Sequence, residues 1–500
     1  MQQPRPRGLA PRRAGALALA ALTLACAKPK ATSAPAPSPA AATAEATPAP
    51  AITKATPPRP AGPPILLRGA KVMTATGTIL DRGDLLIEGE TITALGPEIA
   101  APAGATVIDL AGKVVTPGII DTHSHMGVYP APGFTAHGDG NEMVAPNTAY
   151  ARAADGYWPQ DPQLERARAG GVTVAQILPG SANLFGGRTF TVRLIPGARS
   201  AEDARFPGAP EGLKMACGEN PKRVYGNKAG PQTRMGNVHG YRDAFQKATE
   251  YRRARAKYDK SLAEWEGGKK KDDKGQPIER PEPPARDFAL ETLAGVLAGD
   301  ILVHNHCYRA DEMLLMLDLA RTYGFTIRSF HHAVEAYKIA DRLAEAGTAS
   351  SIWADWWGFK AEAFDGVREN AALLEQAGAR AIIHSDSPVG IQRLNQEAAK
   401  AMHAGRRAGI AITDDQALRW ITINPAWALG IDAKTGTLEA CKLADVVVWS
   451  GDPFSVYSKA ERVFIAGELV YHRGVYEPRT DFELGLRPGD VTGEAKGVTR

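Results

Sequence analysis

The sequence predicts an α/β protein in which a (β/α)8 TIM-like barrel carries a small β-sandwich built from both ends of the chain. Three observations support this prediction. Short β-like runs separated by Gly and Pro fill residues 64–116. Apolar strand-like runs then alternate with helical patterns over residues 117–428, which is typical of a parallel-stranded barrel. The β pattern returns over residues 429–478, so we expect the two flanking segments to pair with each other.

Residues 1–25 resemble an export signal, because basic residues precede an apolar stretch that is too short to span a bilayer. Residues 24–26 (Leu-Ala-Cys) resemble a bacterial lipobox, although Thr23 stands where leucine is usual. We therefore expect an exported bacterial protein, periplasmic or anchored to the membrane by a lipid on Cys26. A cytoplasmic protein with a misassigned start is the alternative. Residues 26–63 are mostly Ala, Pro, Thr and Ser, and this composition predicts a disordered linker.

Composition indicates a globular protein and gives no evidence for a nucleic-acid partner or a disulfide framework. The apolar fraction of 44% is that of a globular protein, and 500 residues suggest two or three segments. Four arginines and no acid lie in the first 25 residues, so the net charge of +4 gives no evidence for a nucleic-acid partner. Beyond Cys26, the cysteines form an odd, widely spaced set that predicts buried free thiols rather than a disulfide framework: Cys217, Cys307 and Cys441.

The barrel elements follow from the alternation of patterns along the chain. The predicted strands after the first are 172–177, 213–216, 301–306, 326–330, 351–353 and 381–384. The predicted helices between them include 310–323, 337–346 and 369–376. Residues 241–285 interrupt the alternation with a charged helix over 241–266 and a Lys/Asp/Pro-rich loop, which we interpret as a solvated insertion. Residues 479–500 are predicted to be a tail.

Histidines gather at the ends of the predicted strands. His123 and His125 end an apolar run, and their i, i+2 spacing places both side chains on one face of a strand. His306, His332 and Asp386 end or follow later strands, and active sites of such barrels lie at these strand ends. Converging imidazoles and a carboxylate are what a divalent metal requires. The sequence therefore predicts a metal site.

Neighbouring histidines offer alternatives to these ligands. His304 shares a face with His306 but would lie one layer deeper, so we expect it to support the site from the core. His331 and His332 are adjacent, and alternation along a strand would let only one of them point inward. His384 shares a face with Asp386 and is a candidate for binding the reacting group.

Several longer motifs indicate a family. They are residues 112–125, 178–187, 214–226, 332–341, 424–426 and 443–448. With these motifs the chain resembles the amidohydrolase superfamily, and within it the imidazolonepropionase-like group that also holds prolidase-like peptidases. The resemblance spans roughly residues 64–478 and is specific to the superfamily, but much less so to a substrate.

The resemblance implies a centre of one or two metal ions per chain, usually Zn²⁺, although another divalent metal is compatible with it. His123 and His125 would bind the more buried ion, and His306 and His332 the more exposed one. Of the adjacent histidines His331 and His332, it is His332 that matches the family motif. Asp386 would contact the buried ion and act as general base and then general acid.

The ligand that bridges two metals in the family is usually a carboxylated lysine and sometimes a glutamate. Lys214 lies within a predicted strand and is the first candidate, and Glu219 is its rival. His384 or the second metal would polarise the substrate carbonyl. Loops after the strands would hold a substrate carboxylate, with the candidate residues Arg188, Arg223, Tyr308 and Arg309.

These features predict a metal-dependent hydrolase that acts on a carbon–nitrogen bond of a peptide-like or cyclic amide. A deaminase of an aminated heterocycle is the alternative, because residues 332–335 (His-Ala-Val-Glu) superficially match the H-x-x-E motif of deaminases. A non-catalytic envelope lipoprotein is a third interpretation. We expect a small-molecule substrate, a homo-oligomer as in many relatives, and membrane contact only through Cys26.

Overall fold

The computed structural model describes residues 62–228 and 230–476. The predicted export signal, the lipobox at Cys26, most of the linker and the tail at 479–500 lie outside these described residues. No helix in the described part of the chain is both long and apolar enough to cross a membrane.

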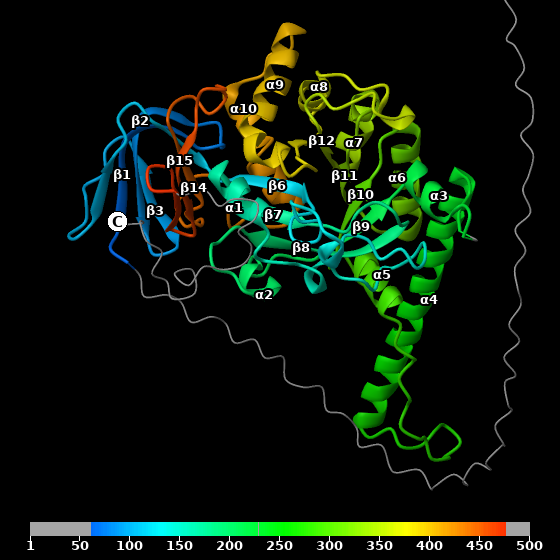
Figure 1. The fold of residues 1–500 in the computed structure, drawn as a ribbon. Helices are drawn as coiled ribbons and strands as arrows, with labels where there is room; N and C mark the ends of the chain where they lie inside the picture. The colour runs from blue at the N-terminus through cyan, green and yellow to red at the C-terminus, as the bar shows by residue number, and fades with distance from the viewer. Residues whose placement is uncertain (1–61, 229, 477–500) are drawn as a thin grey trace, which may run out of the picture. The chain divides into compact units, whose positions relative to one another are not determined.

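Both ends of the described chain build one sheet. Its strands are β1 (Ile65–Met73), β2 (Ile79–Glu88), β3 (Thr91–Gly96), β4 (Thr106–Asp109), β5 (Val114–Pro117), β14 (Val446–Trp449), β15 (Ala460–Ile465) and β16 (Glu468–His472). β14 pairs antiparallel with β5, and Figure 1 shows the blue and red strands side by side. Hydrogen bonds join these strands into one continuous path, with β4 added at β1, rather than into the two sheets of the predicted sandwich. Alternate residues of one face, such as Val115, Val446 and Val448, form its core.

The barrel strands follow in chain order around a second sheet. They are β6 (Ile119–Ser124), β7 (Val172–Ile177), β8 (Phe185–Arg193), β9 (Gly212–Ala216), β10 (Leu302–His306), β11 (Ile327–His331), β12 (Ala349–Ile352) and β13 (Ala381–Ile383). The prediction of a fully parallel barrel was wrong, because β8 runs antiparallel to both of its neighbours. The chain returns from β7 to β8 without a crossover helix, and such a short return allows only antiparallel pairing.

A short segment nearly closes the barrel between its first and last strands. The N–H of Ile120 in β6 donates to the carbonyl of Ile421 at 2.9 Å, and the N–H of Ile383 in β13 donates to Trp420 at 3.0 Å. At the carboxyl ends of the same strands, the N–H of Asp386 donates to the carbonyl of His123 at 3.0 Å. These bonds fix the relative position of two candidate site residues.

Helices lie between and around the barrel strands (Figure 1). They are α1 (Pro162–Ala169), α2 (Ala201–Ala204), α3 (Glu219–Tyr225), α4 (Arg234–Glu266), α5 (Phe288–Ala298), α6 (Ala310–Tyr323), α7 (Ala340–Ala346), α8 (Asn370–Gln376), α9 (Leu394–Arg407), α10 (Asp414–Arg419) and α11 (Ile423–Ala428). The predicted helix 310–323 is α6. The charged insertion is mostly α4, whose first half packs Tyr241 and Phe245 into the barrel core and whose second half is largely exposed.

Candidate metal centre

Three candidate ligands meet at the carboxyl ends of the barrel strands. One ligand-capable atom from each of His123, His332 and Asp386 lies within 4.8 Å of the others. His125 stands beside them: its Nε2 atom is 3.4 Å from Nε2 of His123 and 3.3 Å from Oδ1 of Asp386. The site therefore draws on the first, sixth and eighth strands of the barrel.

Two of these residues have unusual backbone conformations. His332 and Asp386 have φ angles of 58° and 49°, in the left-handed region that residues other than glycine avoid. Such strain costs on the order of 1–3 kcal/mol and is held by the surrounding fold. It also ends the alternation of side chains at the end of β11, so that both His331 and His332 point inward. The expectation that only one of them could do so was wrong.

Burial keeps three of the candidate imidazole ligands neutral. Removal from water lowers the pKa of His123, His306 and His332 well below the ordinary value of 6.5. Repulsion from neighbouring Lys214 and from other histidines lowers the pKa of each ring further. The neutral form of imidazole binds a metal, because one of its ring nitrogens then offers a lone pair.

The proton position of His125 is fixed by the backbone. Its Nδ1 atom lies 2.8 Å from the carbonyl oxygen of Leu178, which can only accept, so Nδ1 carries the hydrogen. In the neutral tautomer of His125, the Nε2 atom that faces Asp386 then carries a lone pair rather than a hydrogen. Within the described residues, the buried Nδ1 atoms of His306 and His332 also lack a hydrogen-bond partner. This set of neutral nitrogens and a carboxylate fits a divalent metal ion.

The two candidates for a bridging ligand occupy different places. Lys214 on β9 is buried, and its Nζ atom lies 3.4 Å from Nε2 of His123. Burial lowers the pKa of Lys214 to about 7, against the opposing effect of the Asp386 charge. Glu219 begins α3 and faces Lys360, with 3.7 Å between Oε1 and Nζ. The structure thus brings Lys214, rather than Glu219, against the candidate histidines.

A cavity of about 460 Å³ opens over the site. Its lining residues are His123, His125, Ser181, Glu219, Asn220, Arg223, His306, Tyr308, His332, Phe359, Lys360 and Asp386. Two of the four expected substrate-binding residues, Arg223 and Tyr308, are among them. Arg188 instead pairs with Glu211 at 3.0 Å and Arg309 with Asp311 at 2.9 Å, and neither lines the cavity.

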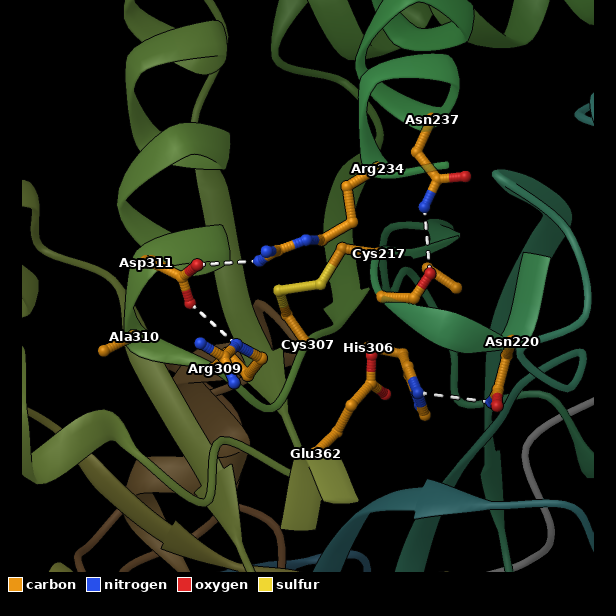
Figure 2. Close-up of a disulfide and its surroundings, with 12 residues drawn as sticks. Cys217, Asn220, Arg234, Asn237, His306, Cys307, Arg309, Ala310, Asp311 and Glu362 are labelled. Atoms are coloured by element: carbon orange, nitrogen blue, oxygen red, sulfur yellow. Dashed lines mark hydrogen bonds and ion pairs between the residues drawn. A yellow bond between two sulfur atoms is a disulfide. The ribbon is translucent and has the colours of Figure 1, made fainter. Parts of the chain in front are cut away.

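Sequence reasoning missed several residues of this lining. Phe359 and Lys360 come from the loop after β12, and Nζ of Lys360 lies 4.0 Å from the centre of the Tyr308 ring. No spacing in the sequence indicates this placement. Asn220 lies within a family-like motif, and its Nδ2 atom is 3.4 Å from Nε2 of His306. Figure 2 shows these two side chains facing each other.

The structure contains a disulfide that the sequence did not predict. Cys217 and Cys307 directly follow β9 and β10 and are bonded to each other (Figure 2), so the expectation of free thiols was wrong for this pair. The two cysteines are 90 residues apart in sequence, but the strands are hydrogen-bonded neighbours and bring their Cα atoms to 5.2 Å. Among the described cysteines, Cys441 alone is free, as expected, but it is exposed, so the expectation of a buried thiol was wrong for this residue.

Two further predicted residues lie outside the cavity over the ligands. His384 is buried, its Nε2 atom accepts from the backbone N–H of His332 at 3.4 Å, and its ring borders a separate cavity of about 910 Å³. Glu335, the glutamate of the H-x-x-E match, accepts a hydrogen bond from the N–H of Ala310 at 2.9 Å. It therefore caps the start of α6 and does not line the cavity over the ligands.

Comparison with known proteins places the chain in a family. Residues 319–471 match the model of the amidohydrolase family. The crystal structure of an amidohydrolase from Thermotoga maritima MSB8 is 36% identical with a TM-score of 0.72, and the match covers 82% of this chain and 100% of that one. The chain therefore belongs to the amidohydrolase family of hydrolases, which confirms the resemblance drawn from its motifs.

Two curated relatives extend the comparison. Amidohydrolase tasK from Hapsidospora irregularis is 35% identical over 402 residues, which is 77% of this chain and 39% of the relative. An imidazolonepropionase from Mesorhizobium japonicum is 26% identical over 407 residues, or 80% of this chain and 92% of the relative. The chain thus spans about two fifths of the length of amidohydrolase tasK.

Proposed function

We propose that this protein is a metal-dependent hydrolase that cleaves a carbon–nitrogen bond in a small peptide-like or cyclic amide. The observation that carries the proposal is the convergence of His123, His332 and Asp386 within 4.8 Å, beside His125. Nitrogen and carboxylate ligands of this kind suit zinc, which we propose as the metal. The imidazolonepropionase relative supports a cyclic amide as one class of substrate.

The chemistry follows from the position of Asp386. A bound divalent ion supplies Lewis acidity that lowers the pKa of water from ~15.7 towards ~7 and polarises the substrate carbonyl. Asp386 has a side chain that is 25% exposed and lines the cavity, so it can reach both water and substrate. It accepts a proton as the water oxygen bonds to the carbonyl carbon. It then delivers that proton to the nitrogen as the carbon–nitrogen bond breaks.

Lys214 is the proposed bridge between two metals. Carboxylation requires a neutral amine, and a pKa of about 7 leaves much of the Lys214 amine neutral at physiological pH. Its Nζ atom already lies next to Nε2 of His123. We propose that carboxylated Lys214 holds the second ion together with His306 and His332.

Arg223 and Tyr308 are the proposed holders of a substrate carboxylate. Both line the cavity, and among the described residues Arg223 forms no ion pair within the cavity lining. A guanidinium binds a carboxylate through two parallel hydrogen bonds. The deaminase alternative has no corresponding support, because Glu335 is engaged at the start of α6.

Export of the chain remains our proposal for its location. Disulfides persist in oxidising compartments, so the Cys217–Cys307 bond supports a periplasmic or cell-surface protein. Lipid attachment at Cys26 and assembly into a homo-oligomer stay predictions.

The test is hydrolysis of a panel of acyl-amino acids, dipeptides and cyclic amides by the zinc-loaded protein, with products identified by mass spectrometry. We expect a carboxylate and an amine, or an opened ring. Ammonia released from aminated heterocycles, with no amide cleaved, would instead identify a deaminase. Turnover of no substrate by a metal-loaded protein would favour the binding-protein interpretation.

A further inference from the structure

We propose that His331 and His304 form a hydrogen-bonded chain behind His123 that fixes the ring orientation and the proton position of this ligand, and thereby sets the affinity of the site for its metal. The inference rests on the proposed metal-dependent function. It assigns positioning roles to two histidines that do not line the cavity over the ligands.

The three rings are joined by two short contacts. Nδ1 of His123 lies 2.7 Å from Nδ1 of His331, and Nε2 of His331 lies 3.0 Å from Nδ1 of His304. All three residues are completely buried, so water does not compete for these bonds. They come from β6, β11 and β10, so the chain of bonds crosses the interior of the barrel.

The number of protons on each ring fixes the direction of the hydrogen bonds between these histidines. A neutral imidazole has one N–H, and His123 needs Nε2 unprotonated if that atom is to bind a metal. Nδ1 of His123 then donates to Nδ1 of His331. Consequently Nε2 of His331 carries its proton and donates to Nδ1 of His304. The opposite direction would place a proton on Nε2 of His123 and block the ligand.

His331 has no nitrogen left for any other role, because both of its ring nitrogens face a neighbouring histidine. His304 ends the chain: within the described residues its Nε2 atom is buried without a partner, as is Oε1 of Gln176. Both side chains crowd Gly212, where a Cβ atom would lie 2.8 Å from Cδ2 of His304 and 3.1 Å from Nε2 of Gln176. Glycine at this position leaves the space that the His304 ring occupies.

The experiment measures zinc affinity by competition with a chromophoric chelator, and records the absorption spectrum of the Co²⁺-substituted protein as a second readout. The variants are His331→Phe, His304→Phe and the double variant, with exposed His239→Phe on α4 as the control. Each single change should weaken zinc binding by roughly 10–100-fold, as loss of a partner behind a metal ligand does. The double variant should bind no more weakly than His331→Phe, because His304 acts through His331.

His331→Asn separates orientation from volume. The Asn Oδ1 atom can replace Nδ1 of the ring as acceptor for His123, but the shorter side chain loses the contact with His304. This variant should keep more affinity than His331→Phe, and adding His304→Phe to it should change nothing further. It also keeps the proposal testable where His331→Phe does not fold, as judged by circular dichroism of the metal-free protein.

The outcomes separate the inference from the proposed function. A wild-type protein that binds no divalent metal would refute the metal-dependent function itself. Metal-binding wild-type protein together with folded histidine variants of unchanged affinity and unchanged Co²⁺ spectrum would overturn the inference alone. Additive losses in the His331→Phe/His304→Phe double variant would also overturn it, because independent effects contradict a chain.

Discussion

The Nε2 atom of His125 lies 3.3 Å from Oδ1 of Asp386, so residues that follow the first and the last barrel strands meet at one point. The backbone bond from Asp386 to His123 and the contact of His125 with the Leu178 carbonyl hold this pair in place. The carboxylate proposed to move protons is therefore held next to a ring nitrogen of His125.

Replacing Asp386 tests its role in proton transfer. Asp386→Asn keeps an oxygen ligand but cannot take a proton from water, so kcat should fall on the order of 10²–10⁴-fold while most of the bound metal is retained. Asp365→Asn, at an exposed loop position, is the matched control and should leave kcat unchanged. Near-wild-type turnover in Asp386→Asn would refute the assignment.

The identity of the bridging ligand can be read from metal content. Lys214→Met removes the buried amine beside His123, and the variant should lose the more exposed ion or bind it much more weakly. Glu219→Gln should keep the wild-type metal content, because Glu219 faces Lys360 rather than the histidines. Elemental analysis per chain decides between them, and the reverse pattern would make Glu219 the bridge.

Loss of the disulfide should destabilise the protein. The bond closes a large loop in the unfolded chain, and removal of such bonds typically costs roughly 2–5 kcal/mol of unfolding free energy. The double variant Cys217→Ser/Cys307→Ser should therefore unfold at lower denaturant concentration than wild type. Cys441→Ser should not, because this thiol is exposed and free. Peptide mapping under non-reducing conditions that finds Cys217 and Cys307 unlinked would contradict the structure.

Glu312 on α6 makes stability depend on pH. Burial raises the pKa of Glu312 from 4.5 to about 7, with a further contribution from the charge of Glu362. A carboxyl with a raised pKa binds its proton more tightly in the folded state, so its favourable contribution is present below about pH 4.5 and is lost as the pH rises to about 7. Glu312→Gln should therefore raise the melting temperature at pH 8 by a few degrees but have little effect at pH 5. An equal effect at both pH values would contradict this explanation.

Most of the candidate site could be predicted from the residues at the ends of the predicted strands. Because the carboxyl ends of barrel strands meet on one face, the positions of His123 and Asp386 along the chain predicted that they converge, whereas the choice of His332 over His331 came from the family motif. The pairing of both chain ends also followed from the return of the β pattern.

Other features depend on the tertiary structure and have no local signal. β8 begins with a Gly-rich stretch of low strand propensity, so it is absent from the predicted strands. The Cys217–Cys307 bond depends on β9 and β10 being neighbours, although a long insertion separates them in sequence. The inward turn of His331 and His332 together depends on a left-handed φ that no alternation rule predicts.

The most direct test of the account is titration of metal-free protein with Zn²⁺, with bound metal and the rate of amide hydrolysis followed together. We predict that the rate is absent without metal, rises with bound zinc and saturates at one or two ions per chain, and that Asp386→Asn binds zinc without gaining the rate. Full hydrolysis by the metal-free protein, or tight zinc binding that leaves the rate unchanged, would contradict a metal-dependent hydrolase.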